Sequence, residues 1–254
     1  MNKKLAGTIF VRNAIEFDYC IEAAIESLKG ICGHIFVVDA GSNDGTVDML
    51  KSMANEQISV ITCRGLWEQI KGREKLSYFT NIAIEYAEKS GFEYQFNLQG
   101  DEILNPDSIP YINRAIELGE EGYLVTRYNL WKDENHMLDV PQSRKPVSTQ
   151  ICRLTKTNYL SVDDAESINC PASLDFINLI SVWHMGFIRN PKKHIAKIKE
   201  IQKNIFKMDN YDSRADLKEE FDWKDWGFTE DDLIPISKPL PIYVQEWAAN
   251  KNKI

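Results

Sequence analysis

The sequence predicts an α/β fold, with a mainly parallel sheet flanked by helices and a C-terminal helical or irregular extension. Apolar runs of strand length alternate with helical stripes over about the first 100 residues, an order that favours parallel strands joined by right-handed crossovers. Two of these runs end in acid, at Asp39 and at Asp101-Glu102. In open sheets of this class, ligands bind over the carboxyl ends of the strands.

Four strands are expected in this first part, at residues 6–11, 35–39, 58–63 and 94–98, with a helix between each strand and the next. The first helix is indicated by apolar residues on one helical face, namely Phe17, Ile21, Ala24, Ile25 and Leu28. The second has an N-cap in Asp44-Gly45-Thr46. The third carries an apolar stripe of Leu76, Phe79, Ala83, Tyr86 and Ala87.

The pattern becomes looser after Asp101. A helix is expected at residues 109–118, and strands are expected at 123–130, 150–154 and 179–187. Residues 192–207 are rich in lysine, residues 209–232 are acidic, and a tail with three prolines precedes a short helix around Trp247. We therefore assign residues 1–190 to one domain and residues 191–254 to an extension packed on it.

Length and charge are those of an ordinary soluble globular protein. The 254 residues can bury a sizeable core, and a net charge of −8 argues against nucleic acid as a partner. The five cysteines are scattered without a C-x-x-C pair, which predicts buried thiols in a reducing compartment. The sequence shows no signal peptide and no apolar stretch of about 18 residues, so we expect a cytoplasmic protein without a membrane span. The lysine-rich segment either touches an anionic membrane or pairs with its acidic neighbour.

Two acidic segments carry the candidate chemistry. Residues 39–46, Asp-Ala-Gly-Ser-Asn-Asp-Gly-Thr, form either a plain strand-to-helix turn or a turn in which Asp39 also accepts bonds from a ribose or a base. Residues 99–102, Gln-Gly-Asp-Glu, form either a solvated turn or a carboxylate site for a cation. The second alternative arises because adjacent carboxylates at the end of a buried strand are costly without a partner.

In these segments the chain resembles the nucleotide-sugar glycosyltransferases of family 2, which have the GT-A fold. Phe10-Val11-Arg12-Asn13 ends the opening strand, residues 37–46 are similar to the family's Asp-x-Gly-Ser-x-Asp-Gly-Thr motif, and residues 99–104 look like its Asp-x-Asp-Glu motif. The resemblance covers about residues 5–105, and extends more loosely to about residue 190. It implies a GT-A-like, Rossmann-type sheet.

The resemblance also implies a function: metal-dependent, inverting transfer of a sugar from a nucleotide-sugar donor in glycan or polysaccharide synthesis. A UDP-sugar is the expected donor, and a hydroxyl of a glycan, a lipid-linked molecule or a protein is the acceptor. Mn²⁺ or Mg²⁺ is expected on Asp101 and His184, where it stabilises the leaving diphosphate. The base that takes the acceptor proton is Asp164 or Glu166. The residues expected to bind the nucleotide are Val11, Arg12, Asp39, Arg73, Lys75, Gly100, Arg189 and Lys193.

Two positions depart from the family pattern. Ala40 stands where many members carry a second aspartate that faces the base, which bears on uracil specificity. Gln99 stands where the first acid of the Asp-x-Asp motif is found, so the expected metal site keeps Asp101 but loses one charge.

Two alternative functions follow from the same residues. A non-catalytic carbohydrate- or nucleotide-binding protein with this fold is favoured by Ala40 and Gln99. A nucleotidyltransferase also uses carboxylates and Mg²⁺, but it is expected to carry a Gly-rich basic loop after the first strand, where this chain has residues 12–16, Arg-Asn-Ala-Ile-Glu. A dehydrogenase is disfavoured because no G-x-G-x-x-G follows any strand. The sequence leaves the oligomeric state open.

Overall fold

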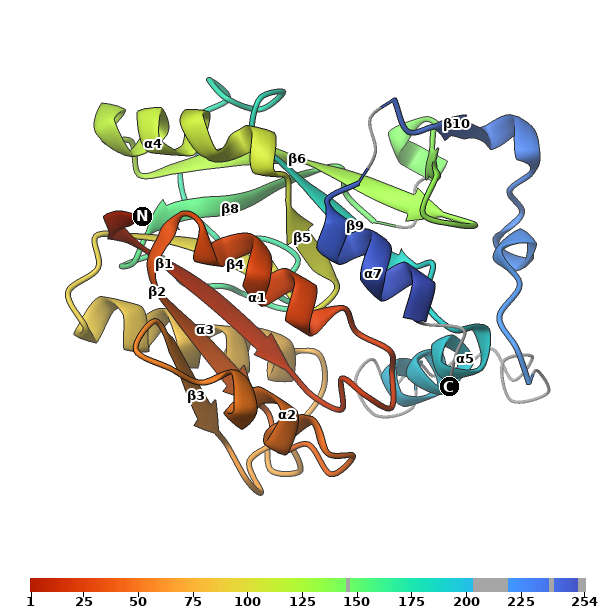
Figure 1. The fold of residues 1–254 in the computed structure, drawn as a ribbon, viewed down its shortest axis with the longest axis horizontal. Coiled ribbons are helices and arrows are strands. Elements are labelled where there is room, and N and C mark those ends of the chain that lie inside the picture. The colour runs from red at the N-terminus through yellow and green to blue at the C-terminus, as the bar shows by residue number, and fades with distance from the viewer. Residues whose placement is uncertain (145–146, 203–218, 238–239, 251–254) are drawn as a thin grey trace.

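The computed structural model describes residues 1–144, 147–202, 219–237 and 240–250. It confirms the expected α/β class: helices cover both faces of a central mixed sheet whose core strands are parallel (Figure 1). In the described residues the main strand order is β10-β7-β6-β8-β4-β1-β2-β3, with β9 joining β5 and β6 beside it.

The parallel part of the sheet comes from the first hundred residues, as predicted. Neighbouring strands in the order β4-β1-β2-β3 all run parallel. The elements are β1 (Asn2–Val11), α1 (Ile21–Lys29), β2 (Cys32–Asp39), α2 (Thr46–Met53), β3 (Ile58–Thr62), α3 (Glu74–Lys89) and β4 (Tyr94–Gln99). Val11 is level with Asp39, and Phe10 is level with Gln99, so these strands finish at one edge.

The second half of the chain extends the sheet mainly with antiparallel pairs. β8 pairs with β4, β6 pairs with β8, and β7 links β6 to β10, all antiparallel. The elements are β5 (Glu102–Leu104), α4 (Ile109–Leu118), β6 (Gly122–Trp131), β7 (His136–Leu138), β8 (Gln150–Lys156), β9 (Ser181–Phe187), α5 (Pro191–Glu200), β10 (Leu233–Pro235) and α7 (Ile242–Asn250).

One short strand was not predicted. We considered a solvated turn at Glu102, but this residue begins β5 and stands opposite His184 of β9 in the antiparallel register. This pairing places His184 beside the Asp101-Glu102 pair. β9 also runs parallel to β6, so it is held from both sides.

Side chains alternate between two cores on either side of the parallel strands. On one side, Leu5 and Ile9 of β1 pack in a cluster with residues of α1 and α4. On the other side, Ala6 of β1 packs with Phe36 and Val38 of β2 and with the apolar stripe of α3. The strands therefore lie buried in the middle of the domain, and only their ends are open to a ligand.

The C-terminal elements pack on the same sheet. Leu240 lies just before α7 and Val244 lies near its start. Both share a core cluster with Cys20 and Ala23. Figure 1 shows α7 lying beside α1. α5 begins after Asn190, whose side chain accepts from the N–H groups that follow. Lys203, Lys207 and residues 209–218 of the charged segments lie outside the described residues.

The cysteines are free thiols, four buried and Cys170 half-buried, as the sequence predicted. Cys152 Sγ lies 3.2 Å from Cys170 Sγ. None of the helices in the part of the chain that the structure describes is long and apolar enough to cross a membrane.

Candidate functional site

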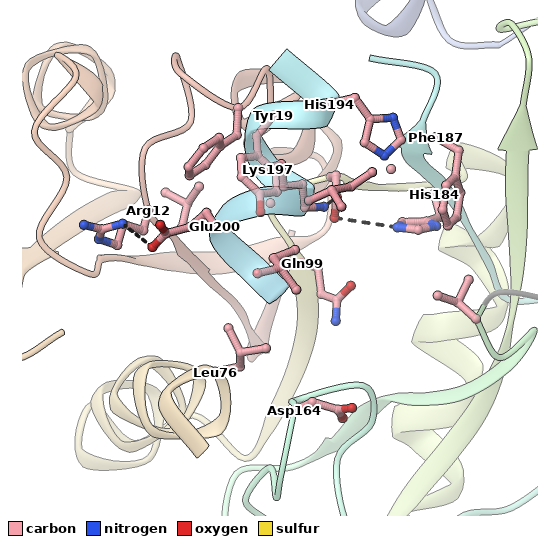
Figure 2. A pocket seen from close by; sticks show the side chains of 18 of the residues that line it. Arg12, Tyr19, Leu76, Gln99, Asp164, His184, Phe187, His194, Lys197 and Glu200 are labelled. Atoms are coloured by element: carbon pink, nitrogen blue, oxygen red, sulfur yellow. Dashed lines mark hydrogen bonds and ion pairs between the residues drawn. The ribbon is translucent and has the colours of Figure 1, made fainter. Parts of the chain in front are cut away.

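A cavity of about 670 Å³ lies at the carboxyl ends of β1 and β4, the edge where the sequence predicted a ligand site. This volume is in the range of small-molecule sites. The ends of β1, β4 and β9, the loop after β8, and α5 all contribute lining residues. Figure 2 shows Arg12, Gln99, Asp164 and Lys197 approaching the cavity from four of these elements.

Asp101, which directly follows β4, is held by two basic side chains. It is only 3% exposed. Its Oδ2 accepts hydrogen bonds from Arg189 Nη2 at 2.5 Å and from Lys197 Nζ at 3.0 Å, and its Oδ1 lies 3.8 Å from His184 Nε2. Burial by itself raises the pKa of Asp101. Interactions with Lys197, His184 and Arg189 lower this pKa by more than burial raises it. The pKa therefore lies well below its usual value, and the carboxylate is ionised.

His184 faces Asp101 as a neutral ring. Its Nδ1 lies 3.0 Å from Asn129 Oδ1, and since an amide oxygen only accepts, Nδ1 donates. Burial lowers the pKa of His184 to about 3, against the opposing effect of Asp101. The position of the His184 ring requires a glycine at residue 186, because a Cβ there would lie 2.5 Å from His184 Nε2.

The predicted metal ligands Asp101 and His184 do come together, but their surroundings do not fit a divalent cation. An ion beside Asp101 would meet the charges of Arg189 and Lys197, both within 3.0 Å of the same carboxylate. Within the described ranges there is no group of three or more His, Cys, Asp or Glu side chains that could hold a metal. Asp101 thus lies in an ion-paired cluster with Arg189 and Lys197, and metal binding by Asp101 and His184 stays a prediction.

Glu102 belongs to a second charge cluster, in which Glu102 and two arginines are fully buried. Its Oε1 accepts from Arg153 Nη2 at 2.7 Å and from Arg127 Nη1 at 3.3 Å. Burial raises the pKa of Glu102, but the two guanidinium groups lower it more. Arg127 also pairs with Glu166. Two acids and two arginines therefore balance, which is the condition for keeping charges in an interior.

The same contacts separate the two candidate bases. Glu166 lines the cavity, but its carboxylate is tied to Arg127. Asp164 also lines the cavity, and among the residues that the structure describes no basic side chain pairs with it. In Figure 2 Asp164 extends from the loop after β8, across the cavity from α5. Asp164 is therefore the carboxylate better placed to take a proton.

The loop that carries Asp164 is held in an unusual conformation. Asp163 and Ala165, on either side of it, have φ values of 51° and 58°, in the left-handed region that non-glycine residues rarely adopt. Gln99 Nε2 donates to the Ala165 carbonyl at 3.3 Å. Gln99 thus acts as a donor to this loop, a role that an aspartate could not fill.

Arg12 and Lys75 surround the indole of Trp67. Arg12 Cζ and Lys75 Nζ each lie 4.8 Å from the centroid of the Trp67 ring, within cation–π distance. Arg12 Nη1 also pairs with Glu200 of α5 at 3.3 Å. Arg12 and Trp67 line the cavity, so this end offers an aromatic edge and a cation to a ligand.

Asp39 has structural partners that the sequence did not reveal. The side chain is fully buried and accepts from the backbone N–H groups of Gly41 and Ser42, each at 3.1 Å to Oδ2. Ser42 Oγ in turn accepts from the N–H of Asn13 at 2.8 Å, which joins the loops after β2 and β1. These contacts show that Asp39 holds the strand-to-helix turn. Its contact with a nucleoside stays a prediction.

The other predicted binding residues divide into two groups. Val11 and Gly100 line the cavity with Arg12, and a Cβ at Gly100 would make a tight contact of 3.1 Å with Val11 Cγ2. The remaining predicted residues are not in the lining: Arg73 is exposed at the start of α3, Lys193 lies on α5, Arg189 lies behind Asp101, and Lys75 sits at Trp67.

Lys197 is the main residue that sequence reasoning missed. We expected the lysine-rich segment to touch an anionic membrane or to pair with its acidic neighbour, but Lys197 turns into the cavity with His194, Ile198 and Ile201 of the same helical face. The spacing of these four residues is that of a buried helical stripe. Because Asn190-Pro191 is a helix start, a lysine on that stripe was the available signal.

Comparison with known proteins gives structural likenesses only. No protein-family model matches this chain, and no curated protein matches it. The chain is similar to residues 1–349 of S. aureus TarS in complex with UDP, at 13% identity and a TM-score of 0.47 over 84% of this chain and 68% of that one.

Two further solved structures are similar over different shares of the chain. A 4-diphosphocytidyl-2C-methyl-D-erythritol synthase has 10% identity and a TM-score of 0.41, over 62% of this chain and 76% of that one. A Bacillus anthracis protein assigned provisionally as a glucose-1-phosphate thymidylyltransferase, crystallised with sucrose, has 11% identity and a TM-score of 0.40, over 98% and 96% of the two chains. At these values the likenesses carry no functional conclusion.

Proposed function

We propose that this protein transfers a sugar from a nucleotide-sugar donor to a hydroxyl of an acceptor, by a single displacement with inversion. One observation supports this most strongly. Asp164, an acid, and Lys197, a cation, face one cavity from different elements, and no residue pairs with both of them in the described part of the chain. The resemblance of residues 37–46 to the family motif supplies the substrate class.

The two groups match the two ends of such a reaction. An acceptor hydroxyl must lose a proton as it attacks the sugar carbon, and the Asp164 carboxylate, which has no basic partner among the described residues, can take it. The leaving diphosphate gains negative charge, and a cation beside it stabilises that charge. Because attack and departure occur on opposite faces of the sugar, a base and a cation on different sides of the cavity suit inversion.

We assign the nucleoside to the end of the cavity near Arg12 and Trp67, where a base can lie along the indole edge. Val11 and Gly100 form the wall there, and the loop held by Asp39 lies next to it. A uridine donor follows from the family resemblance, while Ala40 leaves room for other bases. The acceptor is a glycan, a lipid-linked molecule or a protein.

The test is release of nucleoside diphosphate from a panel of nucleotide sugars, measured by chromatography with glycan acceptors present. Asp164→Asn keeps the shape of the side chain but removes the base, so turnover should fall by about 100-fold or more. Asp163→Asn is the matched control: it changes the neighbouring exposed acid, and asparagine tolerates the left-handed backbone there. Equal turnover in both variants would remove Asp164 as the base.

The panel also separates the alternatives. A non-catalytic binding protein would bind nucleotide sugars and release no product. A nucleotidyltransferase would instead consume a nucleoside triphosphate with a sugar phosphate and release pyrophosphate. Either result would overturn the proposed transfer.

A further inference from the structure

We propose that Lys197 binds the diphosphate of the donor in place of a divalent cation, so that transfer proceeds without a metal. This inference rests on the proposed function and concerns how the same site neutralises its substrate. The sequence predicted a metal ion beside Asp101. In the structure, the positive charges beside Asp101 belong to the side chains of Arg189 and Lys197.

The charges around Asp101 leave one cation in excess. Two basic side chains, Arg189 and Lys197, share this single carboxylate. His194, also in the lining, has a pKa lowered well below its usual value by burial and the nearby cations. The cluster therefore carries one positive charge, next to the cavity.

That excess charge is presented to the cavity by Lys197. Arg189 is fully buried and donates to the backbone oxygens of Phe17 and Gly186 as well as to Asp101, so it is an anchor behind the carboxylate. The Lys197 side chain is 15% exposed and lines the cavity. An ammonium has three donors, and Asp101 takes one of them.

The residues that would complete a metal site are engaged elsewhere. Gln99, in place of the first acid of the motif, gives its amide N–H to Ala165. Glu102 is held between Arg127 and Arg153. Each would have to leave a buried partner before it could bind a cation, and an unpaired buried arginine is costly.

The transfer then balances without a further ion. The bond between the sugar carbon and the diphosphate oxygen breaks, and that oxygen keeps the electron pair. The acceptor oxygen bonds to the same carbon and gives its proton to Asp164. The new charge on the diphosphate remains beside the Lys197 ammonium, which keeps its proton.

The test measures binding of the diphosphates of uridine, guanosine and thymidine by calorimetry, in EDTA and again with Mn²⁺. The wild-type protein should bind one of them in EDTA, with less than about a twofold gain from Mn²⁺. Lys197→Met keeps an apolar side chain of similar length but removes the charged nitrogen, which lies 4.9 Å from the centroid of the Tyr19 ring. Diphosphate affinity in EDTA should therefore fall by about tenfold or more. Affinity for the corresponding nucleoside without phosphates should change by less than about twofold.

Two controls keep the result interpretable. Lys199→Ala removes a lysine from the same helix, outside the cavity lining, and should bind as the wild type does. Lys197→Arg keeps the charge and should retain most of the affinity that Lys197→Met loses. Circular dichroism of each variant reports whether α5 and the sheet are intact.

The outcomes separate this inference from the function on which it rests. Binding that appears only with Mn²⁺, and that Lys197→Met leaves unchanged, would overturn the metal-free site while the transferase function stands. No binding of any nucleoside diphosphate under either condition would overturn the proposed function, and this inference with it.

Discussion

At the scale of single residues, the pKa of His184 changes what pH should do. The family resemblance implies that His184 is a metal ligand, whose protonation would reduce metal affinity as the pH falls. Burial instead lowers its pKa from 6.5 to about 3, so the folded protein keeps the ring neutral across the neutral range. The unfolded chain takes up a proton near pH 6.5 and the folded chain does not.

This difference predicts a loss of stability on acidification. Between about pH 6.5 and pH 3 the unfolded state binds more protons at this position, so the free energy of unfolding rises with pH. One such histidine contributes a slope of up to about 1.4 kcal/mol per pH unit. His184→Asn should reduce the slope by about that amount between pH 4 and pH 6, measured by urea unfolding. An unchanged slope would mean that His184 is protonated in the folded protein.

Asp101 and Lys197 show a limit of reading single residues from sequence. The position of Asp101 at a strand end was correct, and so was its burial. Its partners were not predictable, because Arg189 and Lys197 come from segments about 90 residues later in the chain. A carboxylate that holds a metal and one that holds two cations have the same local sequence.

At the scale of elements, the loop after β8 depends on Gln99 for its shape. The left-handed residues around Asp164 are unfavourable by themselves, and the bond from Gln99 Nε2 to the Ala165 carbonyl helps to hold them. Gln99 is therefore a positioning residue. Its oxygen was expected to replace a metal-binding carboxylate, but its nitrogen makes the contact.

Loss of this bond should affect turnover more than donor binding. Gln99→Leu removes the donor while keeping a side chain of similar size, so the loop is released and Asp164 is less well placed. We expect kcat to fall by about tenfold, with the KM for the donor changed by less than about twofold. Gln99→Glu, which places a second acceptor against the Ala165 carbonyl, should be no better. Equal losses in kcat and in donor affinity would instead place Gln99 in the donor site.

The elements themselves were predictable where hydrophobic periodicity is strong. β1 to β4 and the helices between them follow from apolar runs and stripes that each lie within one short stretch of the chain, so local sequence is sufficient. β5 is only three residues long and pairs with β9 from a distant segment, which leaves no local signal. β6, β8 and β9 were predicted as strands, but their antiparallel pairing was not, because pairing depends on contacts between distant segments.

At the scale of the whole molecule, the cavity unites parts of the chain that we assigned separately. β1, β4 and the loop after β8 lie before residue 190, but Lys197 and Glu200 come from α5, beyond that boundary. The chain carries a net charge of −8, yet the cluster at Asp101 carries an excess cation. In the proposed function, this local charge binds the diphosphate of the donor, although the total composition of the chain is acidic.

The most direct measurement of the central claim is a crystal structure with the nucleoside diphosphate that the binding panel selects. We predict the diphosphate within hydrogen-bond distance of Lys197 Nζ, with the nucleoside toward Arg12 and Trp67 and Asp164 facing the place left by the sugar. A nucleotide bound elsewhere on the protein would contradict the account. So would a diphosphate in the cavity joined to Asp101 through a metal ion, with Lys197 turned away.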